Sequence, residues 1–81
     1  MDFEKGMVVR AKAGRDKGKF LVILEIQGGY ALIADGRRRR VEHPKRKKLI
    51  HLATTNTAHT GSLETNPKIK QILREFNELS V

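Results

Sequence analysis

The sequence contains no cysteine and no tryptophan, and its apolar runs are short. Without cysteine, a disulfide framework, a thiolate metal site and a cysteine nucleophile are all excluded. The longest apolar runs, residues 20–24 and 30–34, have five residues each, whereas a helix that spans a bilayer needs about 20. Residues 1–6 have neither a basic start nor an apolar stretch. We therefore expect no secretory signal, no membrane partner and a cytoplasmic location.

The length of 81 residues is enough for one small domain and too short for two. A chain of this size buries only about 60% of the surface that its unfolded form exposes. Apolar residues make up 38% of the sequence and charged residues 32%, with one Tyr and three Phe. This balance is compatible with a compact fold that has a modest core.

Positive charge is concentrated in one part of the chain. The formal net charge is +8, from 17 Lys and Arg against 9 Asp and Glu. Residues 37–48, which we call the basic segment, hold eight bases and one acid, so this stretch alone carries +7. Because a block of like charges repels itself unless an anion offsets it, the sequence predicts a polyanionic partner that meets one face of the molecule. An ordinary solvated surface is the alternative.

Three short strands are predicted in the first half of the chain, at residues 7–11, 20–27 and 30–34. Between the first two lies a basic stretch with two glycines, residues 12–19, which we call the glycine loop and expect to make a tight reversal. Gly28-Gly29 is a hairpin signal between the second and third strands, because primed turns need the positive φ that glycine adopts at little cost.

The predicted strands differ in how many of their faces are apolar. In the strand at 7–11, one face carries Met7, Val9 and Ala11. In the strand at 20–27, one face carries Phe20, Val22, Leu24 and Ile26, and the other carries Leu21, Ile23 and Glu25. A strand that is largely apolar on both faces is expected where a small barrel curls round its own core.

A second turn signal, Asp35-Gly36, leads into the basic segment. Pro44 cannot donate a hydrogen bond to a sheet ladder, so this segment should be an edge or a loop rather than a central strand. Residues 49–52 have the pattern of a short closing strand. The sequence therefore predicts a mostly β fold, with a small antiparallel barrel over residues 5–53 in a domain of residues 1–53.

The last third of the chain divides into a predicted linker and a predicted C-terminal helix. Residues 54–65 are rich in Thr and show no apolar period, which is typical of a linker. Within residues 66–81, the pattern predicts a helix over roughly 67–80, with an apolar stripe at helical spacing: Ile69, Ile72, Leu73, Phe76 and Leu79. A helix of this length needs a packing partner, which could be its own barrel, another protein or a second copy.

No residue pattern indicates catalysis or a metal site. His43, His51 and His59 recur every eight residues, an interval that places them on no common helix or strand face. The sequence has no Gly-rich phosphate loop followed by a helix, no nucleophile elbow and no close pair of carboxylates in an apolar setting. We therefore expect no enzyme activity, no metal and no cofactor.

The glycine loop carries a motif with a family resemblance. The run Gly14-Arg15-Asp16-Lys17-Gly18-Lys19, between a Val-rich strand and the apolar run 20–26, is similar to the KOW motif of large-subunit ribosomal proteins and NusG-type transcription factors. Many members carry a further glycine where this chain has Leu21, and this departure weakens the match to the bacterial ribosomal and NusG branches. The longer span 12–41, with Ala-Leu-Ile-Ala-Asp-Gly at 31–36, more closely resembles the family of large-subunit ribosomal protein fourteen of the archaeal and eukaryotic type. The resemblance covers about residues 6–52.

The resemblance implies an SH3-like translation-protein barrel that binds ribosomal RNA and has no enzyme activity. Together with the basic segment, it indicates these candidate RNA-binding residues: Arg15, Lys17, Lys19, Arg37, Arg38, Arg39, Arg40, Lys45, Arg46, Lys47 and Lys48. Gly14 and Gly18 are the candidate turn residues of the motif. Tyr30 and Phe3 are the candidate stacking aromatics, because Phe20 and Phe76 fit apolar faces.

The expected partner is RNA, in the first place ribosomal RNA, with the ribosome or a ribosomal protein as a further partner of a chain that we expect to be a monomer. Phosphate contacts would supply affinity rather than sequence readout. A rival interpretation is a protein-interaction module whose basic segment grips an acidic partner and whose helix is the docking element. General binding to DNA is a third interpretation.

Overall fold

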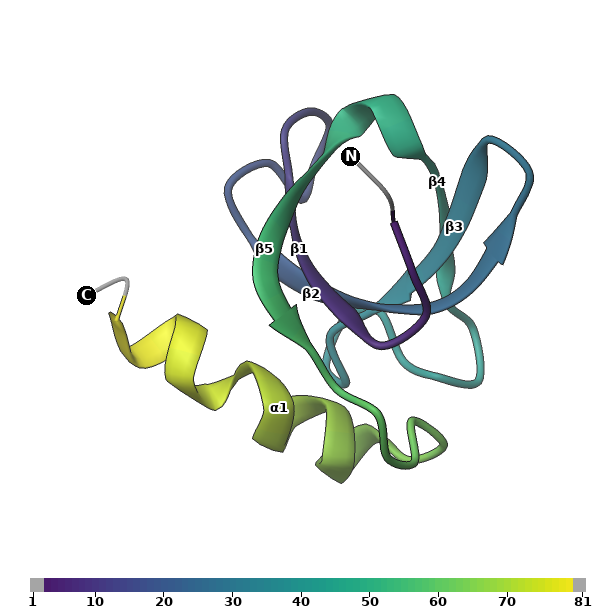
Figure 1. The fold of residues 1–81 in the computed structure, drawn as a ribbon. Helices are drawn as coiled ribbons and strands as arrows, with labels where there is room; N and C mark the ends of the chain where they lie inside the picture. Colours follow the sequence, from purple (N-terminus) through teal and green to yellow (C-terminus); the bar gives the residue numbers. More distant parts are fainter. Residues whose placement is uncertain (1–2, 80–81) are drawn as a thin grey trace.

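A five-stranded antiparallel sheet and one C-terminal helix make up the fold (Figure 1). The computed structural model describes residues 3–79, and for residues 77–79 the backbone alone. The elements are β1 (Met7–Ala11), β2 (Phe20–Gln27), β3 (Tyr30–Ala34), β4 (Lys45–Lys48), the short 3-10 helix η1 (Leu49–His51), β5 (Leu52–Ala58) and α1 (Asn66–Leu79). The predicted strands at 7–11, 20–27 and 30–34 and the predicted C-terminal helix are confirmed over the described residues. Residues 80–81, at the end of the predicted helix domain, lie outside them.

The strand order is β4-β3-β2-β1-β5, so β4 and β5 are the two edges of the sheet. The sheet is strongly curled, and η1 carries the chain from one edge to the other across its end (Figure 1). The prediction of a mostly β, antiparallel fold is confirmed. The predicted barrel is not: β4 pairs only with β3 and β5 only with β1, so the sheet stays open along the line where a barrel would close.

The inner face of the curled sheet holds the first of two apolar clusters. It is made of Val9, Ala11, Leu21, Ile23, Ala31, Ile33 and Leu52, with Phe3, Met7, Ile26 and Leu49 packed against it. Met7, Val9 and Ala11 therefore share one face of β1 as predicted, while Val8 points to the other side. Burial of both faces of β1 and β2 explains why their sequences are apolar on both faces.

A β-bulge in β2 changes the face of one predicted core residue. The pairing of β2 with β3 shifts register between Ile23 and Glu25, so that Leu24 is the extra residue. Because a bulge inverts the alternation of side chains beyond it, Ile26 packs with the inner cluster and not on the face of Phe20, Val22 and Leu24. The prediction for Ile26 was wrong for this reason.

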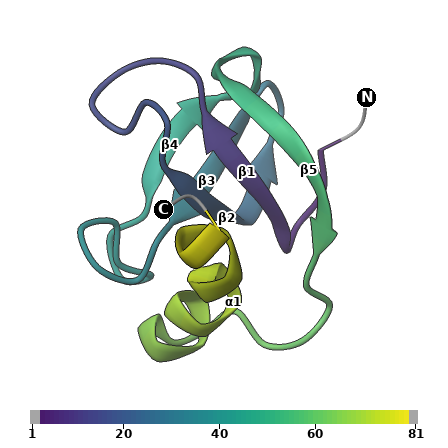
Figure 2. The same cartoon turned by 90° about the vertical axis from the view of Figure 1, so that its left-hand side faces the viewer.

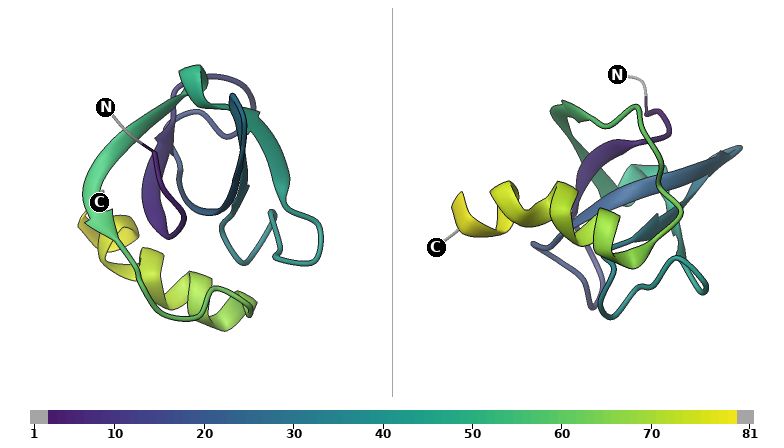
Figure 3. Two further views of the ribbon diagram at one scale, coloured as in Figure 1. Left: turned by 45° about the vertical axis from the view of Figure 1, so that its right-hand side comes forward. Right: turned by 90° about the horizontal axis from the view of Figure 1, so that it is seen from below.

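The C-terminal helix packs on the outside of the sheet. Ile69 and Leu73 of α1 are buried with Val8, Val22 and Leu63, in a second cluster that also includes Phe20 and Phe76. The Phe20 and Phe76 rings lie 5.1 Å apart between centroids, at a tilted angle of 43°. Figures 2 and 3 show the helix against one side of the curled sheet. Of the partners left open for the helix, its own sheet is therefore the one that it contacts; the side chain of Leu79 lies outside the described ones.

Two predictions for residues 49–65 need correction. Residues 49–51 form η1 rather than the start of a closing strand, and residues 54–58, predicted as linker, form most of β5. β5 pairs with β1 in antiparallel register, for example Arg10 with Ala53, and Thr55 Oγ1 donates a 2.6 Å hydrogen bond to the Val8 carbonyl. The C-terminal part of β5, residues 56–58, is exposed, so an alternation of apolar and polar residues is not needed there. Thr is β-branched and therefore suits a strand even where it is not buried.

Candidate nucleic-acid interface

The glycine loop is a tight reversal between β1 and β2. Gly14 and Gly18 adopt positive φ angles of +82° and +85°, a conformation that other residues rarely take. The Gly18 N–H donates to the Ala11 carbonyl at 2.8 Å, and the Lys19 N–H donates to the Asp16 carbonyl at 2.9 Å. The reversal leaves three candidate side chains exposed: Arg15, Lys17 and Lys19.

Residues 35–44, which we call the arginine loop, join β3 to β4. Asp35 closes the loop from within, because its Oδ1 accepts hydrogen bonds from the Arg37 N–H at 2.8 Å and the Arg39 N–H at 2.9 Å. Gly36 has a φ of +81°, and a Cβ placed on it would come within 2.6 Å of the Asn66 carbonyl oxygen. The loop therefore follows a fixed path directly over the start of α1.

The first residue of the helix holds the far end of the arginine loop. Asn66 Oδ1 accepts a 2.8 Å hydrogen bond from the Val41 N–H, and Asn66 Nδ2 donates to Glu42 Oε1. Glu42 Oε2 also accepts from Arg40 Nε at 3.1 Å. The Arg40 hydrogen bond, and then the one from Asn66, lower the pKa of the Glu42 carboxyl below its ordinary value. One carboxylate therefore links an arginine of the loop to the helix.

Two side chains bring the glycine loop and the basic segment together. Asp16 is only 2% exposed and forms a 3.1 Å ion pair with Arg39 Nε. Lys47 of β4 is 9% exposed and donates from Nζ to the Ala13 carbonyl at 2.7 Å. Both loops project from the same side of the sheet, at the left of Figure 2. Arg39 and Lys47 thus have partners inside the chain and are less available to a ligand than the exposed cations.

The remaining candidates are more accessible. The exposed ones are Arg15, Lys17, Lys19, Arg37, Arg38, Arg40, Arg46 and Lys48, and Lys45 is half-buried. Arg10, which lies outside the basic segment and the glycine motif, is also exposed, and its guanidinium lies 3.9 Å from the position of a Cβ on Gly18. Its pairing with Phe20 across the reversal could have identified it, because residues that flank a hairpin loop lie beside it.

The carboxylates among these cations are already engaged. Asp16 pairs with Arg39, Asp35 accepts two backbone N–H groups, and Glu42 pairs with Arg40. Residues 12–19 and 35–48 hold twelve Lys and Arg against these three acids, so the side of the molecule that carries the two loops keeps a strong excess of positive charge. Such a field attracts polyanions.

The two candidate stacking residues, Phe3 and Tyr30, differ in their surroundings. Phe3 packs against the inner cluster, which removes it as a stacking residue. Tyr30, at the start of β3, is half-buried, and the guanidinium carbon of Arg46 lies over its ring, 3.7 Å from the centroid. Phe20 and Phe76 fill the outer apolar cluster, as expected.

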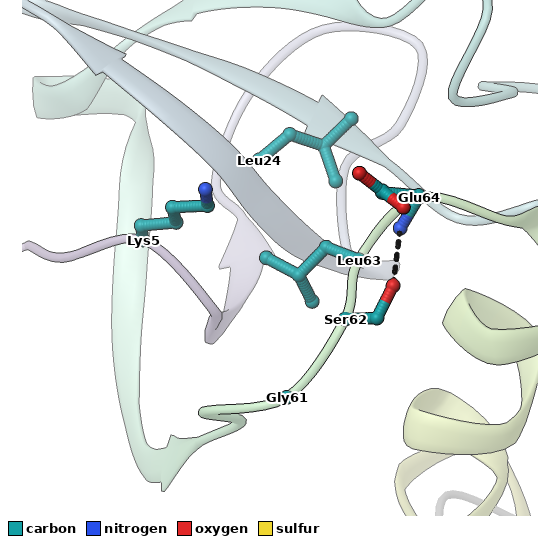
Figure 4. Close-up of a pocket in the computed structure, with 6 residues that line it drawn as sticks. All are labelled: Lys5, Leu24, Gly61, Ser62, Leu63 and Glu64. Atoms are coloured by element: carbon teal, nitrogen blue, oxygen red, sulfur yellow. Dashed lines mark hydrogen bonds between the residues drawn. The ribbon is translucent and has the colours of Figure 1, made fainter.

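A shallow cavity of about 360 Å³ lies beside the segment that leads into the helix. Leu24, Leu63, Lys5 and Glu64 are among the residues that line it, and the Glu64 N–H donates to Ser62 Oγ at 3.3 Å (Figure 4). None of the candidate RNA-binding residues lines it. We assign this cavity no part in the interface.

Among the side chains that the structure describes, those of residues 3–76, no three His, Asp or Glu are grouped so that they could hold a metal ion. The same part of the chain includes no helix that is long and apolar enough to cross a membrane. No protein-family model matches the chain, and a search of curated proteins finds no match.

Proposed function

We propose that this chain is a non-catalytic RNA-binding protein that holds structured RNA through phosphate contacts. The observation that carries the proposal is the junction of the glycine loop and the arginine loop. The Asp16–Arg39 ion pair joins the two loops, and the hydrogen bond from Lys47 to Ala13 joins the glycine loop to the adjoining strand β4. Both loops, which carry exposed cations, project from the same side of the sheet (Figure 2). A fixed array of Arg and Lys suits a backbone of closely spaced phosphates.

The chemistry of the side chains favours recognition of backbone and shape. Arg15, Arg37 and Arg38 are long and exposed and can fork onto phosphate oxygens. Phosphate contacts fix the position of a nucleic acid and carry little sequence information. Structured RNA is recognised largely in this way, by its shape and its sugar-phosphate backbone.

The family resemblance of the glycine loop supports the same proposal. The positive φ angles at Gly14 and Gly18 fit a motif that requires glycine at these two places. We include in the proposal an SH3-like relationship for the curled sheet, ribosomal RNA as the ligand, a monomeric state and a cytoplasmic location. The rival interpretation, an acidic protein partner with the helix as docking element, loses its docking element because the buried stripe of α1 faces the sheet.

Salt dependence of RNA binding tests the electrostatic mechanism. If about five cations meet phosphates, log affinity for a stem-loop of large-subunit ribosomal RNA should fall with log salt at a slope of roughly −3.5 to −4.5. The double variant Arg37→Gln/Arg38→Gln should make this slope shallower by about 1.4 to 1.8. Duplex DNA of the same length, used as a competitor, should displace the RNA poorly.

A matched control removes the same charge elsewhere. Lys5→Gln/Arg74→Gln also lowers the net charge by two but changes exposed residues outside the two loops. We expect this variant to keep nearly the full slope. A slope near zero for the wild-type chain, or equal losses in the two double variants, would contradict phosphate binding at the junction of the loops.

A further inference from the structure

The outer surface of β3 and β4 carries a side-chain arrangement that phosphate contacts do not require. Ala31 and Ile33 point into the inner cluster, so Tyr30 and Leu32 of β3 point outward. Tyr30 pairs with Lys48, and Leu32 pairs with Arg46. The outward row of these two strands is therefore Tyr30, Leu32, Arg46 and Lys48, with the Arg46 guanidinium over the Tyr30 ring.

We propose that the stacked Tyr30–Arg46 pair is a platform for one unpaired base of the bound RNA. The inference rests on the proposed function and names its ligand more narrowly, as structured RNA that presents an unstacked nucleotide beside a paired region. A guanidinium is planar and stacks on aromatic faces. One face of Arg46 is covered by Tyr30, and the side chain is exposed, so its other face can take a base.

The surroundings of the pair suit a nucleotide. Lys48 lies directly across from Tyr30 in the antiparallel register and is exposed, so its ammonium can meet the phosphate of the stacked nucleotide. β4 continues without a break from the arginine loop. β4 has four residues, so at about 3.3 Å per residue it spans roughly 13 Å, and the platform is within reach of an RNA that is held at the arginine loop.

The stacking on Tyr30 also holds the Arg46 side chain in one orientation before RNA binds. The other three aromatic residues, Phe3, Phe20 and Phe76, pack in the two apolar clusters, whereas Tyr30 sits on the outward row of an edge pair. A long arginine side chain loses rotamer freedom when it binds, and a ring beneath it reduces that loss. Base stacking of this kind tolerates any base, because every base has a π face.

The test compares two RNAs on the full chain. One is a fully paired RNA duplex, and the other is the same duplex with a single-nucleotide bulge of 2-aminopurine, whose fluorescence reports stacking. We expect the wild-type chain to bind the bulged RNA about 5- to 150-fold more tightly, the range of affinity that stacking of one base supplies. The 2-aminopurine fluorescence should change when the wild-type chain binds, because the base leaves its neighbours in the RNA, and this change should be lost with Arg46→Lys.

The variants separate stacking from charge and from folding. Arg46→Lys keeps the charge and removes the planar group, so the preference for the bulged RNA should fall toward one while affinity for the duplex stays within about twofold. Tyr30→Leu should lose the preference as well, and Tyr30→Phe should keep it. Thermal melting of each variant verifies that it is folded, and Arg46→Lys suffices if Tyr30→Leu does not fold.

The outcomes distinguish this inference from the proposed function. Equal binding of both RNAs by the wild-type chain would overturn the platform and leave RNA binding standing. Equal weakening of both RNAs by Arg46→Lys would make Arg46 a phosphate contact and overturn the platform too. A melting temperature lowered by Arg46→Lys with an unchanged RNA preference would show an internal structural contact and no platform. Binding of neither RNA would remove the proposed function and the inference together.

Discussion

At the scale of single residues, the structure separates cations that hold the protein together from cations that are free to bind. Arg39 and Lys47 belong to the same basic segment as Arg37 and Lys48, but the first two are tied to Asp16 and to the Ala13 carbonyl. Both ties cross from the basic segment to the glycine loop. Local sequence patterns do not specify such long-range pairing, so the sequence predicted all four of these cations as RNA-binding residues.

Gly18 gives a prediction at this scale. Its φ of +85° penalises a β-branched side chain, although the nearest atom to an added Cβ, an Arg10 guanidinium nitrogen, is 3.9 Å away. Gly18→Val should therefore cost about 1 to 3 kcal/mol through backbone strain rather than through a clash. In a domain of this size that lowers the melting temperature by roughly 4 to 24 °C. Thermal melting followed by circular dichroism measures it.

Gly29 is the matched control for this substitution. It has no positive φ, and an added Cβ would meet nothing within 4 Å. Gly29→Val should leave the melting temperature nearly unchanged. An unchanged melting temperature for Gly18→Val, combined with lost RNA binding, would show that Gly18 serves close approach of the backbone to RNA instead of turn geometry.

At the scale of elements, much of the fold could be predicted from the sequence. The alternation of apolar residues and the Gly-Gly signal identify β1, β2 and β3 because these strands are buried on one or both faces. β5 escaped prediction because its outer half is exposed and lacks a period. The bulge at Leu24 depends on the fit of β2 to β3, which alternation along one strand does not reveal.

The candidate site was predictable in composition but not in arrangement. The charge of the basic segment and the glycine motif identify the two loops. The contact between the loops depends on Asp16. In the sequence Asp16 is an ordinary polar loop residue, whereas in the structure it is buried and paired with Arg39. The role of Asn66 is similar: the sequence marks it as a helix cap, and the structure shows that its side chain binds the arginine loop.

The link between helix α1 and the arginine loop should depend on pH. Hydrogen bonds from Arg40 and then Asn66 lower the pKa of Glu42 from its ordinary value of 4.5. A group whose pKa is depressed in the folded state adds stability above its unfolded pKa and loses it as pH falls through the folded pKa. Glu42→Gln should therefore destabilise the chain at pH 7, and the difference from wild type should shrink as pH falls below about 4.5.

Urea unfolding at a series of pH values measures this difference. Glu75→Gln is the matched control, because it removes one carboxylate from an exposed position of α1. We expect its effect on the free energy of unfolding to be small at neutral pH. A Glu42→Gln variant that differs from wild type by the same amount at every pH would contradict a stabilising charge at Glu42.

At the scale of the whole molecule, helix α1 has two roles: it packs on the outer face of the sheet, and it holds the arginine loop in place. The curled sheet is small and open, and Val8 and Val22 on its outer face are buried together with Ile69 and Leu73 of α1 and with Leu63. The same helix anchors the arginine loop through Asn66, and Gly36 rests against its first turn. Stability and the shape of the basic surface are therefore coupled through one element.

Truncation after Thr65 tests this coupling. It removes the fully buried Ile69 and Leu73, each of which contributes about 1.5 to 3 kcal/mol through its burial. That loss is a large share of the roughly 5 to 15 kcal/mol that stabilises a typical domain. The truncated chain should melt at a much lower temperature and bind a dye for exposed apolar surface. Its RNA affinity, measured at low temperature, should also fall, because residues 41–42 lose their partner on the helix.

If the truncated chain does not fold, the variant Ile69→Ala can test the coupling between helix packing and the basic surface instead. This single change should cost about 2 to 5 kcal/mol, the usual range for truncating a buried Ile to Ala, while Asn66 still caps the loop. Ile69→Ala should therefore lower the melting temperature with little effect on the RNA affinity of the folded chain. Asn66→Ala should instead weaken the free energy of RNA binding by more than it lowers the free energy of unfolding. Amides of Ile72–Phe76 that exchange at random-coil rates in the full chain would show instead that α1 is not held by the sheet, since burial on the sheet is what keeps a helix of this length formed.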